Sequence, residues 1–243
     1  MQKVKKAEKG AETIVEEMFS AGAHYGYSKE RRHPSVSQYI YGTKNKSDII
    51  NLERTVSMLG HAAEFVKNLG SRGKVILFVG TKPEAKTIVR NAAEALSMPY
   101  VVERWIGGTI SNFGEIKRRI AELENYRKEN KEGGLEKYTK KERVIMAKKM
   151  EKLAKYYEGL LGLKKIPDAM FIVDARSEQI AQREAFEAGV PTVALINSDS
   201  NIKDTNYPIL GNDASIPSIS FFTQAIIAAY REGQKSVPEK KES

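Results

Sequence analysis

The chain has 243 residues, 41% of them hydrophobic, which is enough for one sizeable globular domain with an insertion. It has no run of about 18 apolar residues and no apolar segment after Met1, so we expect neither a membrane-spanning protein nor a secretory leader. The absence of cysteine excludes a disulfide framework and a thiolate metal site, and it agrees with a cytoplasmic location.

The net charge of +9 is distributed unevenly. Residues 1–112 hold 17 Lys or Arg against 11 Asp or Glu (+6), residues 113–165 hold 16 against 9 (+7), and residues 166–243 hold 7 against 11 (−4). A basic limb suits a polyanion, of which nucleic acid is the commonest in a cytoplasm. The alternative is a solvated helical surface rich in Lys and Glu.

The first predicted element is a helix over residues 13–20. Residues 37–41 and 48–52 flank a turn-rich stretch, and we expect them to form one further strand and its lead-in. An amphipathic helix over residues 54–69 follows.

A short apolar run at residues 75–79 then predicts a buried strand, followed by a helix over residues 84–96 with Pro83 at its first position and by a strand over residues 100–102. This alternation of strand and helix favours a parallel sheet.

Residues 113–165 interrupt the alternation, because two long helical stretches occur there without a strand. Apolar residues recur along each stretch in steps of three and four, which predicts the narrow contact of an antiparallel coiled-coil hairpin: Ile116, Ile120 and Leu123 in the first, and Met146, Met150, Leu153 and Tyr157 in the second. Glu132-Gly133-Gly134 begins the turn. So thin an apolar stripe leaves the many Lys and Arg side chains in solvent.

Strands over residues 169–173 and 192–196 and helices over residues 178–188 and 216–231 resume the pattern. The strands are continuously apolar, so both faces of the sheet must be covered by helices. We therefore predict a flavodoxin-like doubly wound α/β body over residues 1–112 and 166–232, an inserted hairpin over 113–165 and a flexible tail over 233–243. We expect the left-handed caps after helices at Gly70, Gly73 and Gly189.

A Gly, a hydroxyl and a Lys occur together in Gly80-Thr81-Lys82, between a strand and a helix, where backbone N–H groups favour an anion. The segment matches neither the Walker pattern nor the three-glycine dinucleotide pattern. An RNA phosphate and a soluble nucleotide are alternatives, but we expect a tight turn.

Asp174 follows a predicted strand, where doubly wound enzymes carry catalytic carboxylates. Because Ser177 is close behind, a helix cap or an Asx turn is the simpler interpretation. Asp199, Asp204 and Asp213 could gather with Asp174 at a Mg²⁺ site, although we favour hydrogen-bonded loop scaffolding.

The three histidines, His24, His33 and His61, lack metal-ligand spacing, and no Ser or Cys occurs in a nucleophile elbow. The sequence thus offers no set of catalytic residues. We expect no enzyme, no metal and no cofactor; the alternative is a flavodoxin-like nucleotide-binding enzyme that uses the Gly80 loop and Asp174.

The most unusual string is Arg104-Trp105-Ile106-Gly107-Gly108-Thr109-Ile110-Ser111-Asn112-Phe113, which contains the only Trp. Its paired glycines suggest a close backbone approach, either to pack the insertion or to contact a nucleic-acid backbone. We expect Trp105 and Phe113 to be structural and Arg104 and Asn112 to make contacts.

This string resembles the Arg-Trp-Leu-Gly-Gly run, ending in Asn-Phe, of the family of bacterial small-subunit ribosomal protein number two. Further signature segments of that family occur in the same order between about residues 14 and 231: Gly22-Ala23-His24-Tyr25-Gly26, Phe78-Val79-Gly80-Thr81-Lys82, Thr139-Lys140-Lys141-Glu142, Pro167-Asp168-Ala169 with Asp174, Glu184-Ala185 and Gly211-Asn212-Asp213. The sequence departs from the family at Tyr27, where His is usual, at Arg32-His33-Pro34-Ser35-Val36, where Trp-Asn-Pro-Lys-Met is usual, and at Asn197-Ser198-Asp199, where Asp-Thr-Asn is usual.

The resemblance implies a flavodoxin-like sheet with a coiled-coil insertion in a structural protein of the small ribosomal subunit. It implies binding to ribosomal RNA (rRNA) and to neighbouring ribosomal proteins, including docking of the large multi-OB-fold protein that captures mRNA. We expect no membrane association and no homo-oligomer.

From the charge pattern we expect basic residues of the N-terminal half and the hairpin, together with one amide, to contact the phosphates of rRNA. We expect little recognition of individual bases. The predicted contact residues are Arg31, Arg32, Lys44, Lys46, Lys82, Arg104, Asn112, Lys117, Arg118, Lys140, Lys141, Lys148 and Lys149. Charge reversal at Lys117, Arg118, Lys148 and Lys149 is expected to flatten the salt dependence of binding.

Overall fold

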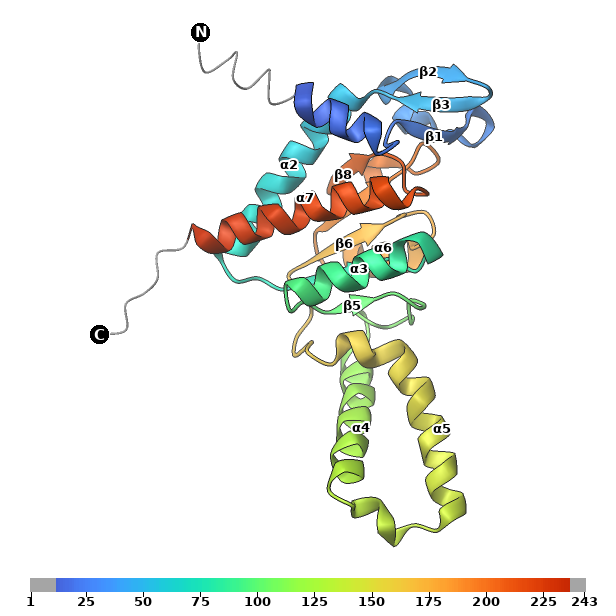
Figure 1. Ribbon diagram of the computed structural model, residues 1–243, viewed down its shortest axis with the longest axis vertical. Coiled ribbons are helices and arrows are strands. Elements are labelled where there is room, and N and C mark those ends of the chain that lie inside the picture. Colours follow the sequence, from blue (N-terminus) through green and yellow to red (C-terminus); the bar gives the residue numbers. More distant parts are fainter. Residues whose placement is uncertain (1–11, 237–243) are drawn as a thin grey trace, which may run out of the picture.

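The structure, a computed structural model, describes residues 12–236. Its centre is a parallel sheet of five strands, β4 (Ile76–Val79), β5 (Tyr100–Val101), β6 (Ala169–Val173), β7 (Thr192–Ile196) and β8 (Tyr207–Leu210), in the order β5-β4-β6-β7-β8 (Figure 1). Numbered along the chain, this order is 2-1-3-4-5, which is that of flavodoxin-like folds. The predicted α/β class is confirmed.

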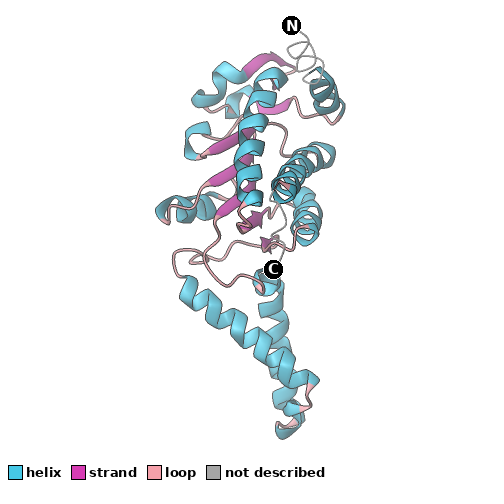
Figure 2. Cartoon of the chain, turned by 90° about the vertical axis from the view of Figure 1, so that its left-hand side faces the viewer, coloured by secondary structure: helices cyan, strands magenta, loops and turns pink. Residues whose placement is uncertain are grey.

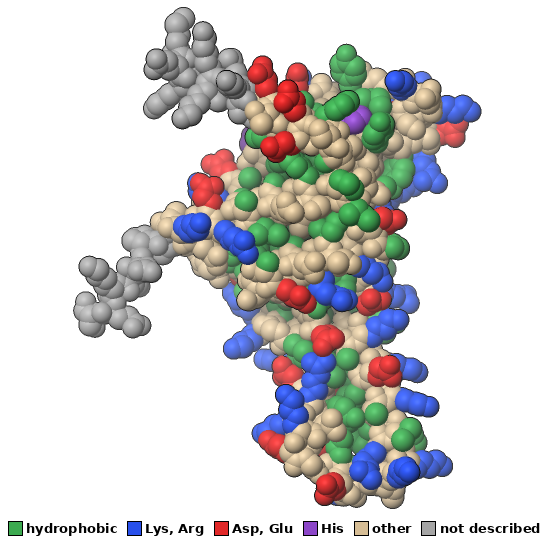
Figure 3. Space-filling view, in the orientation of Figure 1, with side chains coloured by type: hydrophobic (Ala, Val, Ile, Leu, Met, Phe, Trp, Pro, Cys, Tyr) green, Lys and Arg blue, Asp and Glu red, His purple; other side chains and the backbone are tan. Residues whose placement is uncertain are grey.

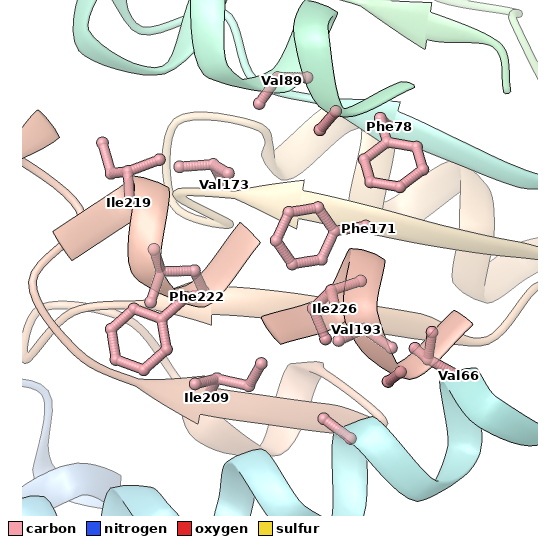
Figure 4. Packing of buried hydrophobic residues seen from close by; sticks show 14 of the residues in the cluster. Val66, Phe78, Val89, Phe171, Val173, Val193, Ile209, Ile219, Phe222 and Ile226 are labelled. Carbon is pink, nitrogen blue, oxygen red and sulfur yellow. The ribbon is translucent and has the colours of Figure 1, made fainter. Parts of the chain in front are cut away.

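Helices cover both faces of this sheet (Figure 2). One face packs against α2 (Leu52–Ser71), α3 (Pro83–Ala95) and α7 (Ile216–Lys235), and Phe78, Phe171 and Phe222 lie in this core (Figure 4). The opposite face packs against α6 (Gln179–Glu187) and the segment around Trp105. Successive strand residues therefore alternate between two separate apolar cores, which accounts for continuously apolar strands.

Two helices project from the body, α4 (Phe113–Lys131) and α5 (Lys140–Tyr157), and the chain reverses between them at Gly133, whose φ is +74° (Figure 1). Thr139 and Glu142 form a capping box at the start of α5, because each side chain accepts a hydrogen bond from the other's backbone N–H. The predicted apolar residues are buried or partly buried, and those nearest the body join its second core. The helices are confirmed; the coiled coil and the division into domains stay predictions.

The N-terminal part differs from expectation. A helix at residues 12–20 agrees with the prediction, but the next segment forms a separate antiparallel sheet of β1 (Tyr25–Ser28), β3 (Ser47–Ile50) and β2 (Ile40–Lys44). β2 and β3 are joined by a two-residue turn in which Asn45 and Lys46 both have positive φ, as a type I′ hairpin turn requires. The expectation of a single further strand was wrong.

Three further details differ from the sequence-based expectation. β8 was missed, because four residues that include Pro208 give a weak signal, and Pro is tolerated there since β8 is an edge strand. Gly70 lies inside α2 rather than at a left-handed cap, whereas Gly73 and Gly189 have the positive φ expected of caps. Helix α7 continues to Lys235, into the predicted tail, of which residues 237–243 lie outside the described residues.

Candidate nucleic-acid interface

Six of the thirteen predicted contact residues lie on the hairpin, and all six are exposed: Lys117, Arg118, Lys140, Lys141, Lys148 and Lys149. Lys and Arg side chains line both edges of the hairpin (Figure 3). Arg118 pairs with Glu115 at 2.8 Å and Lys149 pairs with Glu122, but within residues 12–236 the other four make no ion pair. The four unpaired Lys side chains are thus available to a polyanion.

The N-terminal sheet presents a second basic group. Arg31, Lys44 and Lys46 are exposed, the last two beside the β2–β3 turn. Arg32 differs, because its guanidinium forms a bidentate pair with the fully buried carboxylate of Asp48 and also donates a hydrogen bond to Thr43. The hydrogen bond to Asp48 raises the pKa of Arg32. Arg32 therefore neutralises an internal carboxylate, and its phosphate contact stays a prediction.

The segment from Arg104 to Asn112 joins the sheet to the hairpin and is held by one carboxylate. Glu184 of α6 accepts hydrogen bonds from the Trp105 ring nitrogen (3.2 Å) and from the backbone N–H groups of Gly108 (2.8 Å), Ile110 (3.0 Å) and Ser111 (3.3 Å). Burial alone raises the pKa of Glu184, but these hydrogen bonds outweigh it and lower that pKa. Glu184 thus fixes the position of the loop.

The burial of Trp105 and the partial burial of Phe113 agree with the structural role expected of both, while the contacts expected of Arg104 and Asn112 stay predictions. Trp105 is buried in the second core, while Arg104 and Asn112 are exposed at the two ends of the loop. Gly108 is required by its φ of +92°. The predicted close backbone approach is absent at Gly107, because a Cβ atom there would meet no heavy atom within 4 Å.

Lys82 lies at the carboxyl edge of the parallel sheet, between two carboxylates. Its Nζ is 2.6 Å from Asp174 Oδ2 and 3.1 Å from Asp213 Oδ2, and it donates a hydrogen bond of 3.1 Å to the Tyr27 hydroxyl. Burial lowers the pKa of Lys82, but the charge of Asp213 and the bond to Asp174 outweigh it, so that this pKa is raised. The ammonium neutralises the protein's own carboxylates, and its phosphate contact stays a prediction.

Two of the departures from the family pattern meet at this cluster. Tyr27 contacts Lys82, and burial together with the charge of Asp213 raises the pKa of Tyr27. Asn197 donates a hydrogen bond of 2.9 Å to the Oδ1 atom of Asp213. Neither side chain adds a charge to the cluster at neutral pH, so two carboxylates face one ammonium.

The Gly80 loop is occupied by internal contacts. The Thr81 backbone N–H and hydroxyl both donate to Glu178, at 3.1 and 2.5 Å. Asp174 accepts hydrogen bonds from the Ser177 backbone N–H (3.0 Å) and hydroxyl (2.6 Å). The backbone bond comes from three residues further on, so it is the cap-type contact of the two predicted alternatives rather than an Asx turn. The segment is a tight turn linked to its neighbours, as expected.

The carboxylates considered for Mg²⁺ have other partners. Asp199 pairs with Arg176 at 3.1 Å, and Asp204 accepts a hydrogen bond of 2.8 Å from Asn201. Within residues 12–236, no three His, Asp or Glu side chains are grouped so that they could hold a metal ion. The favoured interpretation of hydrogen-bonded scaffolding agrees with these contacts. Over the same range no helix has both the length and the apolar character needed to cross a bilayer.

A sequence model of the family described as ribosomal protein S2 matches residues 18–233. The chain belongs to the ribosomal protein S2 family. It is 38% identical over 228 residues to small ribosomal subunit protein uS2 of Salinibacter ruber, an alignment that covers 94% of this chain and 71% of that protein. The uS2 protein of Saccharophagus degradans is 38% identical over 231 residues, covering 94% of each chain. That of Thermus thermophilus is 39% identical over 228 residues, covering 94% of this chain and 89% of the relative.

Membership in the S2 family confirms several predictions. The chain is a structural constituent of the small ribosomal subunit and not an enzyme. As a ribosomal component it is located in the cytoplasm. The alternative of a nucleotide-binding enzyme finds no support in the family. The polar groups of the Gly80 loop on which it relied are already bonded within the protein, Lys82 to Asp174 and Thr81 to Glu178.

Sequence reasoning missed the role of Glu184 and a group of exposed side chains on and near α6, namely Arg176, Arg183, Phe186 and Lys203. The sequence did contain one signal for this group of exposed side chains. Ala181 and Ala185 mark the buried face of α6, so Phe186, one position later, lies where a polar residue is usual. Glu184 lies in the signature segment Glu184-Ala185, but nothing local in the sequence indicates its role, because its partners lie more than 70 residues away.

Proposed function

We propose that this S2 protein binds rRNA mainly through phosphates, with the hairpin as its outer contact and the N-terminal sheet and Arg104 loop as its inner contacts. The observation that carries the proposal is the exposure of unpaired Lys side chains along α4 and α5. A helical surface that offers Lys in this way supports contact with a sequence-independent backbone, because an ammonium acts as a point charge and does not select a base.

The proposal keeps the predicted organisation of body, inserted hairpin and tail. It also keeps the antiparallel coiled coil, which is supported by the burial of Ile120, Leu123 and Met150 along facing helices. The protein acts as a single chain within the particle. Because α7 runs to Lys235, we now begin the tail after that residue.

The test is the salt dependence of rRNA binding. Replacement of the four unpaired lysines by Gln leaves the hairpin's ion pairs intact, and it lowers the slope of log K against log salt by roughly one for each phosphate that the variant no longer neutralises. The variant combines Lys117→Gln, Lys140→Gln, Lys141→Gln and Lys148→Gln. Its matched control neutralises four exposed basic residues of the body: Arg54→Gln, Arg72→Gln, Arg90→Gln and Lys235→Gln. An equal loss of slope in both variants contradicts the hairpin as an RNA contact.

We also propose that the protein docks the multi-OB-fold mRNA-binding ribosomal protein through its N-terminal region. Phe19 stacks on the His24 ring, with centroids 4.3 Å apart, and Tyr25 contacts the same ring at a tilt of 39°; both aromatic residues are more than half exposed. Exposed aromatic side chains are enriched at protein interfaces, which supports a protein partner here. Phe19→Ser is expected to reduce co-sedimentation of that partner with small subunits, whereas Tyr207→Ser, at a partly buried aromatic residue elsewhere on the body, is not.

A further inference from the structure

A concave site lies at the carboxyl edge of the parallel sheet, between α6, the loop after β7 and the N-terminal segment that contains Arg31. It is a hollow of about 790 Å³ whose lining includes Arg31, Arg176, Gln179, Arg183, Phe186 and Lys203. Hollows of roughly 300–1,000 Å³ hold ligands of nucleotide size, and open α/β sheets bind ligands at this edge.

The walls of the hollow are joined by hydrogen bonds. The His33 backbone N–H donates to the Ser198 carbonyl at 2.8 Å, and the Ile202 N–H donates to the Ser35 hydroxyl at 3.1 Å. The buried side chain of Gln182 donates to the Asp204 carbonyl and the Thr205 hydroxyl, both at 2.8 Å, and so attaches α6 to the loop. The hollow is therefore a formed part of the fold.

The charge inside the hollow is positive, although residues 166–243 carry a net charge of −4. Arg176 is paired with Asp199, and the Asp204 carboxylate accepts a hydrogen bond from Asn201. Arg31, Arg183 and Lys203 make no ion pair within residues 12–236. Three unpaired cations thus line the hollow, which suits an anionic ligand.

Phe186 lies at the same hollow and is 79% exposed. A flat aromatic ring beside arginine and lysine side chains is how proteins hold single-stranded RNA, because a base stacks on the ring while cations hold its phosphate. The amides of Gln179 and Asn201 line the hollow as well and can hydrogen-bond the edge of a base.

We propose that this hollow binds one unpaired nucleotide of rRNA, with its base stacked on Phe186 and its phosphate held by Arg183 and Lys203. The inference rests on the proposed function, and it adds a contact that reads the shape of a nucleotide rather than a phosphate alone.

Ultraviolet cross-linking of intact small subunits that contain this chain tests the proposal. Trypsin cleaves after Arg183 and Lys203, so a nucleotide on the Phe186 ring appears as an added mass on the peptide of residues 184–203. In subunits reconstituted with Phe186→Ser, the yield of this adduct falls at least about fivefold, the lower limit of what stacking on an aromatic ring contributes. Phe186→Tyr keeps the adduct. Ile180→Ser, which removes another exposed apolar side chain of α6 outside the hollow, also keeps it.

The outcomes separate this inference from the proposed function. Adducts on hairpin peptides without any on residues 184–203 overturn the inference and leave the proposed function standing. If the wild-type chain does not bind rRNA, both the proposed function and this inference are contradicted. A carbodiimide cross-link, in which the amine of Lys203 forms an amide with an activated carboxylate of a neighbouring ribosomal protein, also overturns the inference when it is found in place of a nucleotide adduct, because the occupant is then a peptide.

Discussion

At the scale of single residues, Glu184 shows how one buried acid can hold in place a loop that we propose contacts rRNA. Four donors converge on its carboxylate, and they come from the loop that carries Arg104 and Asn112. Replacement by Gln turns one acceptor oxygen into a donor that faces other donors. We expect Glu184→Gln to lower the free energy of unfolding by more than about 2 kcal/mol at pH 7.

The pH dependence of that loss follows from the lowered pKa of Glu184. The stabilising contribution of a carboxylate with a lowered folded-state pKa is present above its ordinary value of about 4.3, and it is lost as pH falls through the folded-state value. The difference between wild type and Glu184→Gln therefore shrinks below about pH 4.3 in denaturant titrations. Glu187→Gln, at an exposed position of the same helix, serves as the control; a difference that is constant with pH contradicts the assignment.

The cluster around Lys82 gives a second prediction at the residue scale. Asn197→Asp replaces the donor to Asp213 by a third carboxylate near one ammonium, and we expect a loss of roughly 1–3 kcal/mol of stability. Tyr27→His added to it supplies a compensating cation at pH 6. The double variant should lose at least about 0.5 kcal/mol less than the sum of the single variants, a coupling typical of contacting residues. Strict additivity in urea titrations would argue against a shared charge balance.

At the scale of elements, two glycines set the contact between α2 and α7. A Cβ atom on Gly70 would lie 2.2 Å from the Tyr230 carbonyl oxygen, and one on Gly233 would lie 2.0 Å from that of Lys67. Gly233→Ala must push the helices apart, so we expect a loss of at least about 1–3 kcal/mol, measured by thermal unfolding. Gly60→Ala is the control, because a Cβ atom there meets nothing within 4 Å; it should stabilise by up to about 1 kcal/mol. Equal effects at both positions would contradict the close contact.

The same scale shows what could be predicted from the sequence. The strands at residues 169–173 and 192–196 were predicted to the residue, because burial on both faces produces an uninterrupted apolar run. The two helices of the hairpin were predicted because the helical spacing of apolar residues is repeated over a long stretch in each. The N-terminal sheet was not, since its turn at Asn45 and Lys46 lacks the usual glycine.

The candidate site was predictable to a different extent than the fold. Exposure of the hairpin lysines follows from helical periodicity, which is a local property. The pairing of Lys82 with Asp213 and of Arg32 with Asp48 depends on which loops the fold brings together. Neither composition nor local sequence pattern predicts which loops these are. Sequence reasoning therefore found basic residues but could not tell the free ones from those that neutralise internal carboxylates.

At the scale of the whole molecule, the acidic last third does not make an acidic surface. Asp174, Glu178, Glu184 and Asp213 are buried, and they serve as acceptors for loops and for Lys82. An acidic face for a partner, which the charge count alone would suggest, is therefore not supported. The negative charge of that third is used within the fold, so the surface available to RNA is more positive than the sequence count suggests.

The base of the hairpin and the rest of the hairpin differ in how much the fold of the body depends on them. Ile116, Tyr157 and Leu160 belong to the core that covers one face of the parallel sheet, so the base of the hairpin is part of the body. Replacing residues 124–149 by a short Gly-Ser linker should leave the body folded and lower the salt slope of rRNA binding, because that segment holds 9 Lys or Arg against 5 Asp or Glu.

Removing all of residues 113–165 instead exposes the sheet face and should cost about 1.5–3 kcal/mol for each apolar side chain uncovered. Circular dichroism with thermal unfolding distinguishes the two truncations. A body that unfolds in the short truncation, or that is unaffected by the long one, would contradict this boundary between limb and core.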